Sequence, residues 1–81
     1  MPDSIPRFNG AELRILLLLG MGAMHVRPLR AELDDYGSVS RHLKHLEGLG
    51  YIRRERIRGK VMNTLTPKGR RVSKALEALR T

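Results

Sequence analysis

The chain has 81 residues and a formal net charge of +8, with 16 Lys and Arg against 8 Asp and Glu. It has no cysteine, which excludes a disulfide framework and a thiolate metal site, and its longest aliphatic run, 15–19, is far shorter than the roughly 18 residues of a membrane span. Residues 1–7 lack the basic-then-apolar order of a signal peptide, so we expect one small cytoplasmic domain.

The chain begins with an arm and continues as an apolar helix. Residues 1–8 contain two prolines and no hydrophobic periodicity, so we expect a flexible N-terminal arm ahead of one domain over 9–81. Asn9 is a favourable N-cap residue, and Glu12 completes a capping box for a helix over 10–20. Leucine and isoleucine cover nearly the whole circumference of this helix, which is typical of burial on more than one side. We expect it to pack in the core and against a second subunit.

A short strand and a second helix are expected next. Residues 23–26 can form the strand. Pro28 suits the first turn of the helix, because the N–H groups of that turn have no partner within the helix and proline has no N–H. Residues 34–37, Asp-Asp-Tyr-Gly, have the composition of a turn.

A third helix is expected over 38–49, with Ser38 as its cap and Gly50 as the C′ residue that ends it. Three apolar side chains fall within about 60° of one another on a helical wheel. They are Val39, Leu43 and Leu46. This narrow stripe docks the helix on the core and leaves the opposite side polar.

A basic hairpin and a last helix complete the domain. Residues 51–57 and 61–65 are expected to be strands joined by a turn at 58–60, and Thr66 caps a helix that starts at Pro67. This order predicts a mainly α fold with a small β-hairpin (α+β). The architecture is a winged helix-turn-helix with a three-helix core, a two- or three-stranded wing sheet and a C-terminal helix.

Positive charge is concentrated in residues 38–74, which carry eleven of the sixteen Lys and Arg but only two of the acidic residues. Such a block suits a polyanion, because neutralised phosphates release condensed counterions. The major groove of DNA admits one helix that is polar on its outer face. We therefore predict double-stranded DNA as the partner of a nucleoid-associated protein, with a recognition helix at 38–49 in the major groove and a wing at 53–60 on the backbone or minor groove.

The candidate DNA-binding residues are polar and basic side chains on the outer faces of this helix and wing. They are Ser38, Ser40, Arg41, Lys44, His45, Arg54, Arg56, Arg58 and Lys60. Arg41 and Lys44 are the best candidates on the helix, while Arg58 and Lys60 flank the turn of the wing. An ordinary solvated helix face and edge-strand charges that block aggregation are the alternative interpretations. Five basic residues in the eight positions 53–60 exceed what edge protection requires.

The last helix leaves two questions open. Its basic residues either contact phosphates or form a solvated face. They are Lys68, Arg70, Arg71 and Lys74. Its apolar stripe belongs either to the core or to a dimer interface with the first helix, and we favour a shared role. The stripe contains Val72, Leu76 and Leu79.

Residues 39–54, Val-Ser-Arg-His-Leu-Lys-His-Leu-Glu-Gly-Leu-Gly-Tyr-Ile-Arg-Arg, resemble the recognition-helix-to-wing segment of MarR- and PadR-type winged-helix regulators. Residues 65–69, Leu-Thr-Pro-Lys-Gly, resemble the family's Leu-Thr-x-x-Gly start of the helix after the wing. The resemblance implies a transcriptional regulator that binds a pseudo-palindromic operator as a homodimer, with recognition helices about 10 base pairs apart. The chain is shorter than full-length MarR proteins, and its wing lacks their usual Asp-Arg pair. We therefore expect no small-molecule effector.

Metal binding and catalysis are not expected. His42 and His45 have a spacing that could hold a metal, but no third ligand follows and the neighbouring Arg41 and Lys44 would repel a cation. Ser40 and His42 are two apart on a helix, so they point away from each other and cannot act as nucleophile and base. We expect no enzyme, no metal and no cofactor.

Two other functions remain open from the sequence. An architectural or chromatin-type protein would coat duplex DNA with little sequence preference, and a protein-interaction module would dock an acidic partner on the same basic surface. Single-stranded nucleic acid ranks lower, because only three aromatic residues are present and they form no stacking platform.

Overall fold

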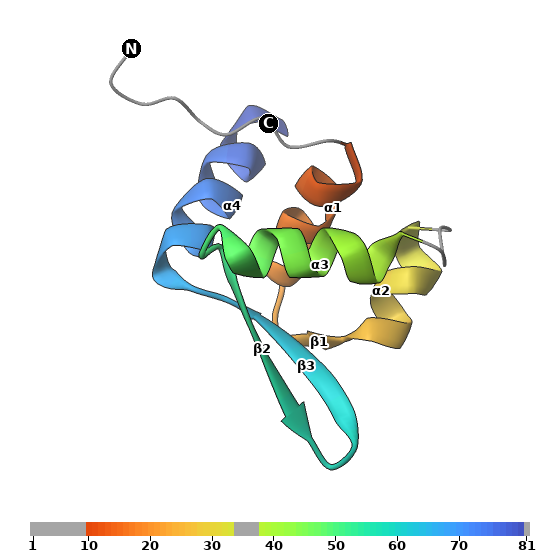
Figure 1. The fold of residues 1–81 in the computed structure, drawn as a ribbon. Coiled ribbons are helices and arrows are strands. Elements are labelled where there is room, and N and C mark those ends of the chain that lie inside the picture. The colour runs from red at the N-terminus through yellow and green to blue at the C-terminus, as the bar shows by residue number, and fades with distance from the viewer. Residues whose placement is uncertain (1–9, 34–37, 81) are drawn as a thin grey trace.

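The described residues form four helices and a three-stranded antiparallel sheet (Figure 1). The structure, a computed structural model, describes residues 10–33 and 38–80. In chain order the elements are α1 (Gly10–Leu19), β1 (Met24–His25), α2 (Val26–Leu33), α3 (Val39–Gly48), β2 (Ile52–Ile57), β3 (Lys60–Leu65) and α4 (Pro67–Arg80). The predicted winged helix-turn-helix architecture is confirmed, and the sheet has three strands because the short β1 pairs with β3.

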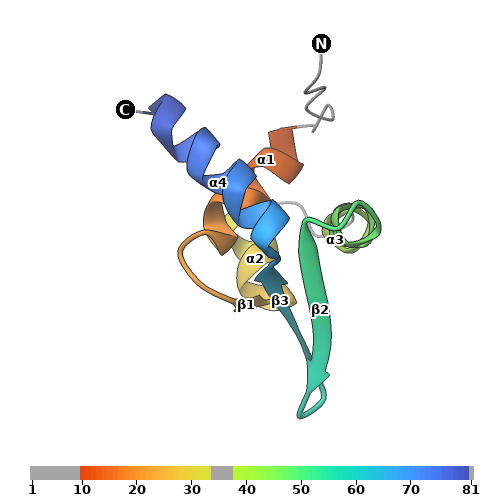
Figure 2. The ribbon, with the colours of Figure 1, turned by 90° about the vertical axis from the view of Figure 1, so that its left-hand side faces the viewer.

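The hairpin of β2 and β3, here called the wing, projects from one end of the molecule, while α1 and α4 pack together at the other end (Figures 1 and 2). α3 lies beside the base of the wing and contacts β2, α1 and α2. Among the described helices, none is both long and apolar enough to cross a membrane. This layout presents α3 and the wing on the same side of the molecule.

One hydrophobic core joins the helices to the sheet. Its buried side chains are Ile15, Leu16, Leu19, Leu29, Val39, Leu43, Leu46, Tyr51, Ile52 and Leu65. The predicted apolar stripe of α3 is wholly in this core, and α1 contacts α2, α3, α4 and β3, so it packs on several sides as predicted. Each buried aliphatic side chain contributes about 1.5–3 kcal/mol relative to exposure. The core thereby holds α3 with its polar side outward.

The middle strand of the sheet is β3, in the order β1-β3-β2. The register places Asn63 opposite both Arg54 of β2 and Met24 of β1. Successive side chains of a strand point to opposite faces, so Arg54 and Asn63 lie on the same face as the buried Ile52 and Leu65. The core face of the sheet therefore continues into the wing with polar residues.

Gly50 ends α3 as predicted. Its φ of 84° is in the left-handed region, its N–H donates to the Glu47 carbonyl oxygen at 3.0 Å, and the Tyr51 N–H donates to the Leu46 carbonyl oxygen at 3.0 Å. These two bonds form a Schellman motif, which satisfies carbonyls that a helix end otherwise leaves unpaired. The turn delivers Tyr51 into the core and starts the wing at a fixed angle to α3.

Thr66 connects the end of the wing to the end of α3. Its N–H donates to the Tyr51 carbonyl oxygen at 3.1 Å, and its hydroxyl donates to the Gly50 carbonyl oxygen at 2.6 Å. The same hydroxyl accepts from the Gly69 N–H at 3.1 Å, so Thr66 is the predicted cap of α4. A Cβ on Gly69 would overlap the Tyr51 carbonyl oxygen. The Leu-Thr-x-x-Gly pattern therefore has a steric and hydrogen-bonding basis.

Some local predictions need correction, and others lie outside the described residues. Ser38 occupies the N-cap position of α3, but its side chain makes no capping hydrogen bond. Lys60 belongs to β3, so the turn consists of Arg58 and Gly59 alone. The N-terminal arm, the Asn9 cap and the turn at 34–37 are outside the described residues.

Candidate nucleic-acid interface

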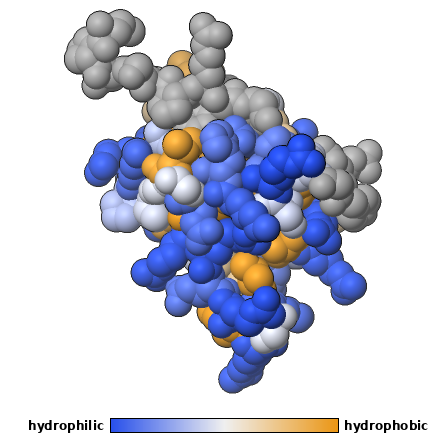
Figure 3. All heavy atoms as spheres, viewed as in Figure 1, coloured by the Kyte–Doolittle hydropathy of each residue, from blue (hydrophilic) through white to orange (hydrophobic). Residues whose placement is uncertain are grey.

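The outer side of α3 carries exposed basic residues. Arg41, Lys44 and His45 are exposed, whereas Ser38 and Ser40 are half-buried at the start of the helix. Hydrophilic side chains cover most of the side that α3 and the wing present (Figure 3). The apolar residues that alternate with them are in the core, so the surface follows directly from the amphipathic pattern of α3.

Two histidines attach α3 to α1 through Glu12. His42 Nδ1 lies 3.2 Å and His45 Nδ1 2.7 Å from Glu12 Oε2, and the Glu12 side chain is only 5% exposed. An ionised carboxylate only accepts hydrogen bonds, so an imidazole that bonds an ionised Glu12 here is in the form that carries a proton on Nδ1. Within 10–33 and 38–80, no group of three His, Asp or Glu side chains is arranged to hold a metal ion. His45 can reach an outside partner through Nε2, since its Nδ1 is engaged with Glu12.

Strand alternation separates the arginines of the wing. Arg53 and Glu55 lie on the outer face and form an ion pair with Nη2 and Oε1 3.3 Å apart. Arg54 is half-buried on the other face, and its Nε–H donates to Asn63 Oδ1 at 2.9 Å. Arg56 shares that face further along the strand and is exposed. Two of the predicted contacts, Arg54 and Arg56, thus lie on the face that continues from the core.

The tip of the wing has an unusual backbone conformation. Arg58 has a φ of 51° and Gly59 a φ of 79°, as in a tight two-residue hairpin turn with positive φ at both positions. Glycine or asparagine suits the first position better, and a non-glycine residue there costs about 1–2 kcal/mol. Arg58 therefore occupies a backbone conformation that an arginine disfavours.

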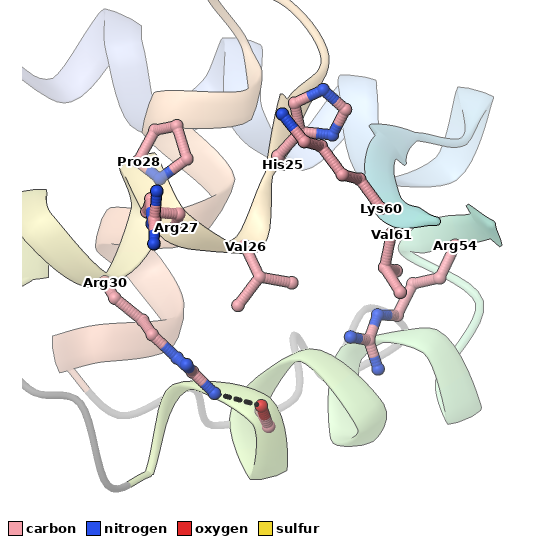
Figure 4. Close-up of a pocket in the computed structure, with 9 residues that line it drawn as sticks. His25, Val26, Arg27, Pro28, Arg30, Arg54, Lys60 and Val61 are labelled. Atoms are coloured by element: carbon pink, nitrogen blue, oxygen red, sulfur yellow. Dashed lines mark hydrogen bonds between the residues drawn. The ribbon is translucent and has the colours of Figure 1, made fainter. Parts of the chain in front are cut away.

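A pocket of about 840 Å³ lies where α2, α3 and the wing diverge (Figure 4). Its lining residues are His25, Val26, Arg27, Pro28, Arg30, Ser40, Arg54, Lys60 and Val61. Arg30 Nη2 donates to Ser40 Oγ at 3.1 Å, the dashed line of Figure 4. No segment of the sequence predicts this pocket, because it is formed between elements that are distant in the chain.

Three polar residues of this pocket are not among the predicted contacts, namely His25, Arg27 and Arg30. They precede the basic block 38–74 and lie in a part of the chain with little net charge. The basic residues of α2 could have been found by placing them on the helix, because Arg27 and Arg30 are three apart and therefore share one side.

One basic residue of α4 has a structural role. Lys68 Nζ donates to the Leu49 carbonyl oxygen at 2.9 Å and lies 4.5 Å from the centre of the Tyr51 ring. The carbonyl belongs to the C-terminal end of α3, where a cation is favourable. Lys68 therefore connects α4 to α3, while Arg70, Arg71 and Lys74 are exposed.

The fold is similar to that of solved structures that include FabT, AdcR and ZitR. FabT of Streptococcus pneumoniae in complex with DNA is 24% identical with a TM-score of 0.87, and the match covers 96% of this chain and 58% of that chain. The adhesin competence repressor AdcR of Streptococcus pyogenes is 14% identical with a TM-score of 0.85, covering 91% and 58%. ZitR of Lactococcus lactis, a zinc-responsive MarR family member, is 21% identical with a TM-score of 0.83, covering 94% and 55%.

The chain thus spans little more than half the length of these structures. No protein-family model matches it, and no curated protein is significantly similar in sequence. The resemblance to MarR-type winged-helix proteins is confirmed for the fold.

Proposed function

We propose that this protein is a DNA-binding transcriptional regulator that recognises a specific duplex sequence with α3 in the major groove and the wing on the backbone or minor groove. The proposal rests on the observation that α3 and the wing lie on the same side of the molecule. Arg41 and Lys44 are exposed on α3, and Arg56, Arg58 and Lys60 are exposed on the wing beside it. A helix that enters the major groove reads base edges, and flanking cations hold phosphates. The FabT structure of the same fold contains DNA, which supports this assignment.

The local chemistry favours binding over catalysis. Ser40 accepts a hydrogen bond from Arg30, and His42 contacts Glu12 of α1. The Ser40 hydroxyl and the His42 imidazole therefore have different partners, and they do not form a nucleophile–base pair. We infer that the protein is not an enzyme.

Selection of bound sequences from a random duplex pool tests the proposal. A symmetric consensus is the expected result, and the log of the binding constant should fall steeply with the log of the salt concentration. A featureless pool with the same salt dependence would instead indicate an architectural DNA-coating protein. No retention of DNA would favour a protein-interaction module for an acidic partner.

A symmetric consensus requires a dimer, and we propose that α1 and α4 form its interface. Met21 and Leu79 are 82% and 83% exposed, although each is a large apolar residue next to the α1–α4 pair. α1 and α4 approach closely, because a Cβ on Gly20 would overlap Ser73 Oγ and this hydroxyl donates to the Leu16 carbonyl oxygen at 2.9 Å. The pair therefore forms a rigid platform with apolar residues at its edge.

Light scattering tests this interface. Leu79→Arg should convert a dimer into a monomer, since a charge would have to be desolvated in an apolar contact. Ala78→Arg adds the same charge one position along α4, on a different side of the helix, and should leave the mass unchanged. An unaltered mass for Leu79→Arg would place the interface elsewhere.

A further inference from the structure

The pocket between α2, α3 and the wing combines cations with an apolar floor. Arg30 approaches it from α2 and Arg54 from β2, and Val26 lies between them (Figure 4). Val61 of β3 adds to the apolar lining. A guanidinium offers N–H groups in a fork that matches two phosphate oxygens. Two such groups on either side of a small apolar surface suit an anionic group that carries C–H surface beside its charge.

Both arginines are held in place by the protein. Arg30 uses one terminal nitrogen, Nη2, to donate to Ser40 Oγ at the start of α3. Arg54 uses Nε to donate to Asn63 Oδ1, and its terminal nitrogens point into the pocket (Figure 4). A guanidinium that is already fixed before the ligand binds lowers the conformational-entropy cost of binding. The neighbouring Arg53, on the other face of β2, instead pairs with Glu55.

Asn63 is the residue that fixes Arg54. It is fully buried on the central strand, and its Nδ2 donates to the Met24 carbonyl oxygen of β1 at 3.0 Å. Its Oδ1 accepts from Arg54 at 2.9 Å. Because the amide nitrogen is bound on one side and the amide oxygen on the other, the side chain cannot rotate without losing both bonds. Asn63 therefore connects the three strands and sets the direction of Arg54.

We propose that this pocket binds one sugar–phosphate unit of the DNA backbone, an inference that rests on the proposed function. Arg30 and Arg54 hold the phosphate, and the deoxyribose packs against Val26 and Val61. Asn63 is a positioning residue that acts through Arg54. A backbone held between α2 and the wing sets the depth and register of α3 in the major groove, which is the usual role of phosphate contacts.

Fluorescence anisotropy of the full chain with a labelled duplex, measured over a series of salt concentrations, tests the two arginines. Arg30→Ala and Arg54→Ala should each weaken binding about tenfold on every duplex sequence and reduce the slope of the log–log salt plot by about 1. Arg53→Ala is the matched control, since it removes the same charge from the same strand on the outer face. Its slope should stay close to that of the wild type.

The role of Asn63 is tested by a double-mutant cycle with Arg54. Asn63→Leu should weaken binding in the wild-type background but have no further effect in the Arg54→Ala background, because it acts only through that arginine. An equal loss in both backgrounds would show a merely structural role and would overturn the positioning assignment. If Asn63→Leu does not fold, Arg54→Lys replaces it. Lysine keeps the charge but lacks the Nε–H whose bond Asn63 accepts, so Arg54→Lys should keep the wild-type salt slope and still bind more weakly than the wild type. Wild-type affinity would contradict the positioning.

The results for the pocket and for the proposed function are distinguishable. If the wild type binds duplex DNA with a steep salt dependence, but the Arg30 and Arg54 variants behave like Arg53→Ala, the pocket assignment is overturned and the DNA-binding function stands. If the wild type binds no duplex DNA at any salt concentration, both are overturned.

Discussion

The tip of the wing and its base, where the wing joins the end of α3 and the start of α4, are both positively charged. Their cations are held differently. At the base, Lys68 bonds the end of α3 and Arg54 bonds Asn63, so these side chains are fixed by the fold. At the tip, Arg56 and Arg58 are exposed, and Arg58 has a costly backbone conformation. The difference indicates that the base sets the angle between the wing and α3, while the cations of the tip are exposed to the solvent. Changes to the backbone contacts at the base should therefore alter stability, whereas changes at Arg54 or at the tip should alter DNA binding.

The largest effect is expected for Gly69→Ala at the base of the wing, and it is a loss in the free energy of unfolding. The added methyl would overlap the Tyr51 carbonyl oxygen, which is backbone and cannot move aside without breaking the bond to Thr66. We expect a loss of about 3 kcal/mol or more in the free energy of unfolding, measured by urea denaturation.

Gly48→Ala is the matched control for this variant. Gly48 lies in α3 with open space around it, so alanine there should stabilise the protein by up to about 1 kcal/mol. Equal effects of the two substitutions would contradict the close packing of α4 on the start of the wing.

The next largest effect concerns the exposed side of α3. Arg41→Ala should weaken binding to the selected duplex by about 1–3 kcal/mol and relax the sequence preference at one position, while the free energy of unfolding stays unchanged. Binding is measured on the selected duplex and on single-base variants of it. Arg14→Ala, which removes an exposed arginine from α1, is the control. Uniform weakening on all duplexes would show that Arg41 contacts a phosphate, and would favour the architectural alternative.

A smaller effect is expected at the base for Thr66→Val. The substitution keeps the branched shape but removes the hydroxyl that donates to the Gly50 carbonyl and accepts from the Gly69 N–H. We expect a loss of about 1–2 kcal/mol in the free energy of unfolding. Thr64→Val, on the outer face of β3 opposite Arg53, should change it by less than about 0.5 kcal/mol. Similar losses for both threonines would mean that the Thr66 hydroxyl does not hold the base together.

A small gain in stability is expected for a change at the tip. Arg58→Asn should raise the free energy of unfolding by about 0.5–1 kcal/mol, because asparagine tolerates a positive φ and favours this turn before glycine. DNA affinity should fall at the same time, with a salt slope reduced by about 1. Thermal unfolding and anisotropy give the two values on the same sample. A variant that is more stable and binds equally well would remove the tip from the interface.

Many of the local features of α3 and of the base of the wing could be predicted from the sequence. The Gly50 C′ position, the Thr66 cap and the apolar stripe of α3 each depend on residues within one turn or one helix, and the structure confirms them. The capping bond of Ser38 was predicted in the same way and is wrong, since the serine occupies the cap position without making the bond. The candidate DNA contacts stay predictions, although α3 and the wing do lie on one side.

Other features depend on residues that are distant in the chain. Glu12 was read as part of a capping box, and its contacts with His42 and His45 arise only because α1 packs beside α3. Arg30 lies outside the basic block, and it reaches Ser40 because α2 and α3 are neighbours in the fold.

The sequence by itself determined the order of the elements, the winged-helix architecture and the sign of the charged surface, because periodicity, caps and net charge are local or additive properties. Only the tertiary structure decided which cations are fixed and which are exposed. Arg53 and Arg54 are adjacent and chemically identical, yet one pairs with Glu55 on the outer face and the other with Asn63 beside the pocket. The physical reason is the two-residue period of the strand, which assigns each arginine a face, combined with the register that places Asn63 opposite Arg54.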